Sequence, residues 1–175
     1  MQDVTAVVAA FEGSKQIPLS SLLEWLDSPV LDVRGAAFAY LEREDCVARI
    51  SPTLTQDQFD DRYLDYLKRC LLADTRGEWV HARYEASWAL ASWFKRSIAG
   101  DENSPRLIAL RQWLGETYKA APALRDALLN GFLEHVVGQP SASRFFSAWK
   151  KDSELGSALR AARLWNDDAA SGPGL

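Results

Sequence analysis

Apolar residues recur along this chain at spacings of three and four, and Ala, Leu, Arg and Glu dominate the stretches between breaks. Such spacing is typical of helices, whereas the sustained alternation that marks strands is nearly absent. Pro, Gly and small polar residues separate the helical stretches. After a short helix that ends at the break 12–18, the pattern predicts helices over 22–26, 31–44, 55–72, 79–98, 106–119, 122–137, 141–150 and 154–166.

Several predicted helices carry a signal at their first turn. Thr55 precedes Gln58 by three residues, which is the pattern of a capping box. Ser104 and Pro105 are suited to the cap and the first turn of the helix predicted over 106–119. Ser20 or Ser21 is expected to cap the helix over 22–26. We predict one helical domain over 1–166 and, because the last residues offer little to bury, a disordered C-terminal tail over 167–175.

The helices pair into four consecutive hairpins that repeat about every 35 to 50 residues, a period typical of helical solenoids. The second helices of the first three hairpins align on an arginine. Small or apolar residues follow this arginine after three positions, and large apolar ones follow after seven. The aligned arginines are Arg34, Arg83 and Arg125, followed by Ala37, Ala86 and Leu128 and then by Leu41, Leu90 and Phe132.

One of these helices resembles a known repeat. The stretch SPVLDVRGAAFAYL, residues 28–41, is similar to the second helix of a HEAT-like repeat, and the later hairpins keep part of its pattern. The matching residues are Pro29, Asp32, Val33, Arg34, Ala37 and Leu41, then Val80, Arg83, Ala86 and Leu90, then Pro122, Leu124 and Arg125. Over about residues 20–137 the resemblance implies an all-α, short right-handed superhelix of HEAT/armadillo-like hairpins stacked side by side. It also implies a habit of binding partners, and it carries over no catalytic residue.

The stretch from Trp79 to Phe94 is apolar on nearly every side, although a helix packed on one side needs an apolar stripe only about 100° wide. In a stack of hairpins, a middle helix contacts its partner and both neighbours. We therefore expect this helix to be enclosed on most sides. Arg83 is expected between hairpins, where its planar group of donors reaches carbonyl oxygens or acids of the adjacent turn.

Composition limits the class of protein. The chain has 175 residues, 47% of them hydrophobic and 25% charged, which are values of an ordinary folded domain. Its net charge of −4 disfavours nucleic acid and favours a protein partner with a basic surface. Cys46 and Cys70 are expected as buried free thiols. Because neither a signal peptide nor an apolar run near 18 residues is present, we expect a cytoplasmic protein with no membrane segment.

A polar and aromatic stripe is the candidate contact surface. On a helix over 79–98, His81, Glu85, Trp88, Ser92 and Lys95 or Arg96 follow one another on one face. We predict His81, Glu85, Trp88, Ser92 and Arg96 as partner-binding residues, because exposed Trp is a frequent binding anchor. The alternative is a partly buried polar seam. Most of the seven tryptophans are expected in the core.

The candidate chemistry is sparse. His81 and Glu85 are four residues apart, and with His135 they would supply the three ligands of a metal-dependent enzyme or sensor. A surface pair or buried polar groups with hydrogen-bond partners is the simpler interpretation, so we predict no metal and no cofactor. The acid pairs Asp57/Asp61, Asp60/Asp61 and Glu42/Asp45 could act as general acid and base, but acids in a first helical turn are common. Phosphate-loop, nucleophile-elbow and CxxC motifs are absent from the sequence.

These observations favour a non-enzymatic module that binds another protein. The more specific hypothesis is a small cytoplasmic inhibitor or immunity-type protein that docks on a toxin or effector, since acidic charge suits docking over a basic active site. An adaptor or assembly factor is the alternative within this class. The metal-dependent enzyme or sensor centred on His81, Glu85 and His135 is the alternative in a different class.

Overall fold

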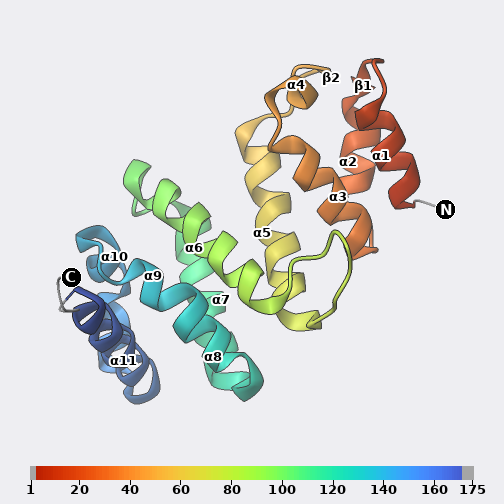
Figure 1. The fold of residues 1–175 in the computed structure, drawn as a ribbon. Coiled ribbons are helices and arrows are strands. Elements are labelled where there is room, and N and C mark those ends of the chain that lie inside the picture. Colours follow the sequence, from red (N-terminus) through yellow and green to blue (C-terminus); the bar gives the residue numbers. More distant parts are fainter. Residues whose placement is uncertain (1–2, 171–175) are drawn as a thin grey trace, which may run out of the picture. The chain divides into compact units, whose positions relative to one another are not determined.

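The computed structural model describes residues 3–170 of the chain, and the side chains of residues 3–164. Helices dominate this part of the chain (Figure 1), which confirms the all-α fold class. The chain divides into two compact units, Met1–Ala86 and Ser87–Leu175, which we call the N-terminal and the C-terminal unit. The single domain over 1–166 and the HEAT-like superhelix stay predictions.

The N-terminal unit is built around one short helix, α3. Its elements are α1 (Val4–Glu12), β1 (Ile17–Pro18), α2 (Leu19–Leu26), α3 (Leu31–Leu41), α4 (Glu44–Val47), β2 (Ile50–Ser51), α5 (Gln56–Ala73) and the first turn of α6 (Arg83–Gly100). Helix α3 packs against α1, α2, α4 and α5, and seven of its eleven residues are buried. It is therefore α3 that is enclosed on most sides.

Small residues allow neighbouring backbones to approach α3 closely. A Cβ atom on Gly35 would lie 1.8 Å from the carbonyl oxygen of Trp79, so only glycine fits where the segment between α5 and α6 crosses this helix. Asp32 accepts a hydrogen bond of 3.2 Å from the Trp79 N–H, and the rings of Tyr40 and Trp79 stack at 6.0 Å. The segment is thereby fixed along α3.

Several elements of this unit differ from the prediction. The helix expected over 31–44 ends at Leu41, and α4 follows as a separate turn. Strands β1 and β2 pair in parallel, with Ile17 opposite Ile50. Two-residue strands are too short for a periodic signal, so the sequence pattern could not indicate them.

The C-terminal unit contains the rest of α6 and the later helices. These are α7 (Pro105–Ala120), the 3₁₀ turn η1 (Pro122–Leu124), α8 (Arg125–Leu128), the π-helical turn η2 (Leu129–Leu133), α9 (Glu134–Val136), α10 (Pro140–Phe145), the 3₁₀ turn η3 (Phe146–Lys151) and α11 (Ser153–Ala170). Helix α11 packs against α7, η2, α9 and η3. In the core, Phe94 lies 5.5 Å from both Phe132 and Phe146, measured between ring centroids.

The predicted helix ends are confirmed in part. Thr55 and Gln58 form the capping box at the start of α5, and Pro105 occupies the first turn of α7, although the Ser104 side chain makes no capping hydrogen bond. Helix α2 begins at Leu19, so neither Ser20 nor Ser21 precedes it. Helix α11 continues to Ala170, and residues 171–175 of the predicted tail lie outside the described residues.

Candidate partner-binding surfaces

The predicted stripe of five residues does not form one helical face. Helix α6 begins at Arg83, so His81 precedes it. Glu85 folds back over the first turn, where its carboxylate accepts a hydrogen bond of 2.8 Å from the Ala82 N–H. This is the role of an acid at the third position of a helix. The helical geometry expected for His81 and Glu85 is therefore wrong, because the segment before α6 is extended along α3.

The other three residues of the stripe do share a face in the C-terminal unit. Trp88, Ser92 and Arg96 follow at intervals of four along α6, and all three are exposed. Half of the Trp88 surface is accessible. The expectation that the helix is enclosed on most sides is thus wrong for this face. Trp93 and Phe94 carry the opposite, buried side, which accounts for the apolar character that the sequence shows on nearly every side.

His81 belongs to a hydrogen-bond cluster inside the N-terminal unit. The Tyr66 hydroxyl lies 3.0 Å from Nδ1 of His81, accepts from the His81 N–H at 3.2 Å and donates to the Trp79 carbonyl at 3.1 Å. Tyr66 is fully buried, and burial raises its pKa. Burial lowers the pKa of His81. The cluster satisfies polar groups that the packed segment before α6 would otherwise leave without partners.

The three aligned arginines occupy two kinds of surroundings. Nε of Arg83 donates to the Leu71 carbonyl near the end of α5 at 3.0 Å, and Nε of Arg125 donates to the Tyr118 carbonyl near the end of α7 at 2.9 Å. Each of these two arginines therefore binds the last turn of the helix that precedes it. Acids complete both arrangements, Asp74 at 3.2 Å from Arg83 and Glu154 at 3.5 Å from Arg125.

Arg34 differs, because it faces the helix that follows it. Its Nη1 lies 2.8 Å from Asp65 on α5, and its Nη2 donates to the Arg62 carbonyl at 3.2 Å. The Arg34 side chain is 3% exposed, whereas that of Asp65 is 49% exposed. The expectation that Arg83 lies between hairpins is wrong, because Arg83 contacts the last turn of α5, the other helix of its own predicted hairpin. The three arginines align in the sequence, but only Arg83 and Arg125 have similar surroundings, whereas Arg34 contacts a helix of the following hairpin.

The described residues contain no cluster of side chains that could hold a metal ion. Among these residues no three His, Cys, Asp or Glu side chains gather closely enough to bind a metal ion. Of the proposed ligands, His81 bonds to Tyr66 and Glu85 bonds to the Ala82 backbone, while His135 is exposed. Cys46 and Cys70 are free and buried, which confirms the prediction for both thiols.

Charge is unevenly divided along the chain. Residues 1–86 carry 15 acidic and 9 basic side chains, a net charge of −6, whereas residues 87–175 carry 9 acidic and 11 basic ones, a net charge of +2. The excess of acid concentrates further in residues 41–61, where six acids and two arginines give −4. The total of −4 conceals this division. The exposed face of α6 formed by Trp88, Ser92 and Arg96 lies in the C-terminal unit, whose net charge is positive, and Arg96 adds a cation to this face.

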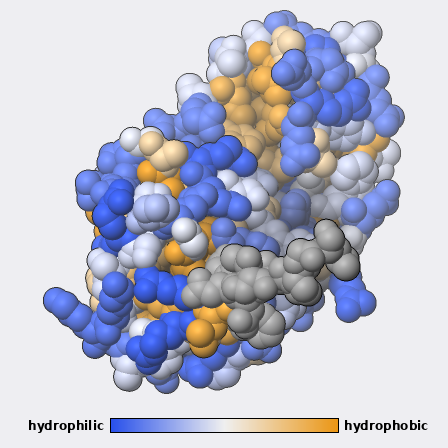
Figure 2. Space-filling model, turned by 60° about the vertical axis from the view of Figure 1, so that its left-hand side comes forward, coloured by the Kyte–Doolittle hydropathy of each residue, from blue (hydrophilic) through white to orange (hydrophobic). Residues whose placement is uncertain are grey.

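A hollow lies beside this acidic segment. It has a volume of about 240 Å³ and draws its lining from three places, the end of α3, helix α4 and the start of α5 with the residues before it. Its lining residues are Leu41, Val47, Leu54, Thr55, Gln56 and Phe59. We call it the α4–α5 hollow. Figure 2 shows hydrophobic residues gathered in a patch on the N-terminal unit, bordered by hydrophilic ones.

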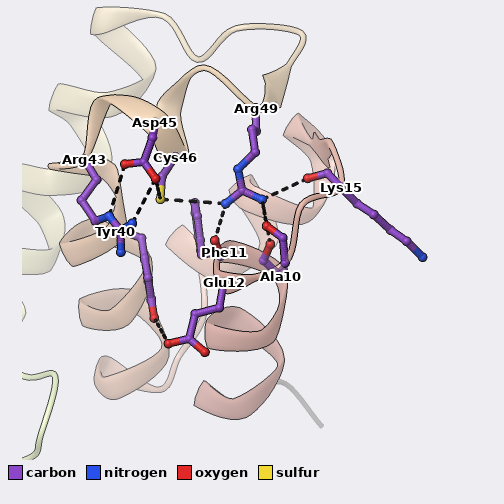
Figure 3. A network of polar contacts seen from close by, with 10 residues as sticks. Ala10, Phe11, Glu12, Lys15, Tyr40, Arg43, Asp45, Cys46 and Arg49 are labelled. Carbon is purple, nitrogen blue, oxygen red and sulfur yellow. Dashed lines mark hydrogen bonds and ion pairs between the residues drawn. The ribbon is translucent and has the colours of Figure 1, made fainter.

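A network around Arg49 fixes one side of the segment that carries this hollow (Figure 3). The Arg49 guanidinium donates to the carbonyl oxygens of Phe11 and Gly13 at the end of α1, and to that of Lys15 at 3.1 Å. The Tyr40 hydroxyl donates to Glu12 at 3.2 Å. Since Ile17 N–H also bonds to the Arg49 carbonyl at 2.9 Å, the segment that follows α4 is tied to α1 and β1 by both side chain and backbone.

A second hollow of about 590 Å³ is lined by the end of α1, the α1–β1 connection and α2. It is lined mainly by small and apolar residues, with Lys15 as a cation among them, and the Lys15 side chain points away from the Arg49 network in Figure 3. Its lining residues are Ala9, Ala10, Gly13, Ser14, Lys15, Gln16, Ile17, Pro18, Ser21 and Trp25. No sequence motif indicates it.

Comparison with known proteins adds no family. No family model, no curated protein and no solved structure matches the chain significantly. Within the described residues, no helix is long and apolar enough to cross a membrane.

Proposed function

We propose that this chain is a non-enzymatic protein-binding module that docks on a partner with a basic surface, and that it acts as an inhibitor or immunity-type protein. The observation that carries the proposal is the division of charge, −6 in residues 1–86 against +2 in residues 87–175. A field of one sign over one unit speeds the approach of a partner of the opposite sign and disfavours partners of the same sign.

The helical-repeat part of the proposal is supported by Arg83 and Arg125. Each joins the start of one helix to the last turn of the preceding helix through an Nε–H donor and an acid. Two helical hairpins that are closed in the same way are what a HEAT-like repeat would contain. Solenoids of this kind present extended surfaces to protein partners.

The exposed face of α6 is a second proposed contact surface. It keeps three of the predicted binding residues, Trp88, Ser92 and Arg96, and the exposed indole offers a large apolar contact. Its basic character differs from the acidic segment of the N-terminal unit. We therefore propose that the basic surface of the partner lies against the N-terminal unit, and that the α6 face makes a separate contact.

The cytoplasm is the proposed location, because free buried Cys46 and Cys70 suit a reducing compartment. An adaptor or assembly factor would use the same acidic unit, and only the effect on the partner distinguishes it from an inhibitor. The metal-dependent alternative has less support, since His81 and Glu85 are each engaged in hydrogen bonds that hold the start of α6.

The test uses purified components. The full chain is mixed with a candidate partner, such as the product of a gene adjacent to that of this chain. The dissociation constant of the complex is then measured at several salt concentrations. We expect a one-to-one complex that weakens as salt rises, together with loss of the partner's activity. A complex that leaves this activity intact identifies an adaptor instead. Binding that is indifferent to salt, or an acidic partner, contradicts the proposal.

A further inference from the structure

The α4–α5 hollow has a partly exposed apolar lining, and aromatic residues behind the lining hold it in place. Leu41, Val47, Leu54 and Phe59 are each partly exposed at its walls. The Phe59 ring is held from behind by Phe38, whose centroid is 5.7 Å away, and by stacking on Tyr63 at 5.2 Å. Apolar side chains held in a partly open position are available to a partner without first being rearranged.

Hydrogen bonds fix the remaining walls. Thr55 and Gln58 exchange the two bonds of the capping box, 3.2 Å from the Gln58 N–H and 3.0 Å from the Thr55 N–H. Gln56 donates to Asp60 at 3.0 Å. On the side of α4, Cys46 is fully buried next to Val47. The shape of the hollow is thus set by the fold of the N-terminal unit.

The size of the hollow limits what it can hold. Small-molecule pockets have volumes of roughly 300–1,000 Å³, and the α4–α5 hollow, at about 240 Å³, is smaller. Its walls are mainly apolar and carry two small polar groups, those of Thr55 and Gln56. One or two apolar side chains of another protein are the occupant that matches this volume and lining.

The charges beside the hollow are predominantly negative. Glu42 directly follows the lining residue Leu41, Glu44 begins the helix that carries Val47, and Asp57 directly follows Gln56. All three carboxylates are exposed. The two arginines of the segment are already engaged, Arg43 with Asp45 at 3.0 Å and Arg49 with backbone carbonyls. Residues 41–61 thus carry a net charge of −4, and the exposed carboxylates of Glu42 and Glu44 stand next to the lining of the hollow.

We infer that the α4–α5 hollow is a docking site for a partner segment in which one or two apolar side chains are flanked by lysine or arginine. This inference rests on the proposed function and specifies which surface of the acidic unit is used. The apolar side chain fills the hollow and sets how long the complex lasts, and the flanking cations pair with the surrounding carboxylates and raise the rate of encounter.

A first experiment needs no natural partner. The ¹⁵N-labelled full chain is titrated with an acetylated, amidated hexapeptide that has Phe-Leu between two pairs of lysines. Two comparison peptides replace Phe-Leu by Gly-Ser or the lysines by glutamates. We expect amide shift changes concentrated in residues 41–59 with the first peptide, and at least about tenfold weaker binding of both others. Shifts located elsewhere, or equal binding of the acidic peptide, overturn the inference.

Matched variants test the same surface. Glu42→Lys with Glu44→Lys reverses two charges at the hollow, and Glu24→Lys with Glu78→Lys makes the same change of net charge with exposed residues away from its lining. Leu54→Ala removes an apolar wall from a loop residue. We expect the first pair and Leu54→Ala each to raise the dissociation constant of the peptide about tenfold, and the second pair to change it less than about threefold.

The outcome separates the docking site from the proposed function. If a basic protein partner binds the chain but is unaffected by the Glu42 and Glu44 reversals, the docking site is wrong and the binding function stands. If the lysine peptide binds at residues 41–59 while basic partners fail to form a complex, the site stands and the proposed function is wrong. Thermal unfolding of each variant verifies that the fold is intact, and an unfolded Leu54→Ala variant is replaced by Leu54→Met.

Discussion

The hydroxyl oxygen of Tyr66 lies 3.0 Å from Nδ1 of His81, in the interior of the N-terminal unit. The same oxygen bonds to the backbone at Trp79 and at His81. One phenol on α5 thereby holds residues 79 and 81 of the segment that leads into α6. A histidine that the sequence indicated for partner binding, or for a metal, thus has a structural hydrogen bond, and the contact explains why α6 begins only at Arg83.

Replacing Tyr66 by Phe tests this hydroxyl. The change leaves the ring in place but removes the partner of the Trp79 carbonyl and of the His81 N–H. We expect the free energy of unfolding to fall by roughly 1–3 kcal/mol, the cost of leaving buried polar groups without partners. Urea unfolding measures it. Tyr84→Phe, at a residue that is 43% exposed, is the control and should change the value by less than about 0.5 kcal/mol. Equal values for both variants contradict the role of Tyr66.

Gly35→Ala tests the close crossing on α3. Because the new methyl group would lie 1.8 Å from the Trp79 carbonyl oxygen, backbone must move, and we expect a loss of stability of about 1–3 kcal/mol or more. Gly100→Ala is the matched control, since a Cβ there meets no atom within 4 Å. The free energy of unfolding of the Gly100→Ala variant should differ from that of the wild type by less than about 1 kcal/mol, and any change should be an increase in stability. A neutral Gly35→Ala variant would refute the crossing.

The pair Arg34–Asp65 makes stability depend on pH. Burial raises the pKa of Asp65, but hydrogen bonds from Arg34 and Arg69 more than offset this and leave its pKa below the usual value. The stabilisation is therefore complete above the unfolded-state pKa of about 3.9 and is lost as pH falls through the folded-state pKa. We expect Asp65→Asn to be less stable than the wild type at pH 6, with a difference that shrinks toward pH 2. A difference that is constant across this range in urea unfolding would count against the pair.

The buried thiols should be unreactive in the folded chain. Burial raises the pKa of Cys70 to about 11, so that roughly 0.1% of it is thiolate at pH 8, and Cys46 has no accessible surface. We expect iodoacetamide at pH 8 to add nothing to the native chain and two groups to the chain in concentrated urea, as read from the intact mass. Rapid single labelling without urea would show that one thiol is accessible.

Trp88→Ala tests the second proposed contact surface. Half of the Trp88 surface is exposed, so the substitution should change the free energy of unfolding by less than about 1 kcal/mol. If the α6 face binds the partner, the dissociation constant should rise by at least about fivefold, as for a central binding residue. Ile108→Ala, at a residue of α7 that is 44% exposed, is the matched control. An unchanged dissociation constant for Trp88→Ala removes this face from the interface.

Local signals predicted the positions of most helices. The Thr55–Gln58 capping box and Pro105 lie at the starts of α5 and α7 because these signals depend only on neighbouring residues. The course of the segment before α6 could not be predicted, because it depends on the missing side chain of Gly35 and on the hydroxyl of Tyr66 in another helix. Residues that contact each other across the fold leave no periodic pattern in the sequence.

The candidate surfaces differ in the same way, because one depends on local spacing and the other on contacts across the fold. Trp88, Ser92 and Arg96 are exposed together because their spacing of four survives on α6. The α4–α5 hollow combines Leu41, Val47 and Phe59 from three helices. The connection between α4 and α5 passes through the two-residue strand β2. The acid pairs in this segment were visible in the sequence, but the apolar walls beside them required the fold.

The crossing of Trp79 over Gly35 also determines when the N-terminal unit is complete during synthesis. Helices α1, α2 and α3 have all left the ribosome by the time residue 60 emerges, yet the groove above Gly35 is still open to water. It closes only when residues 79–81 arrive to bond with Asp32 and Tyr66. A nascent chain halted before residue 79 therefore leaves the α3 backbone at Gly35 uncovered, and Asp32 and the Tyr66 hydroxyl without these backbone partners.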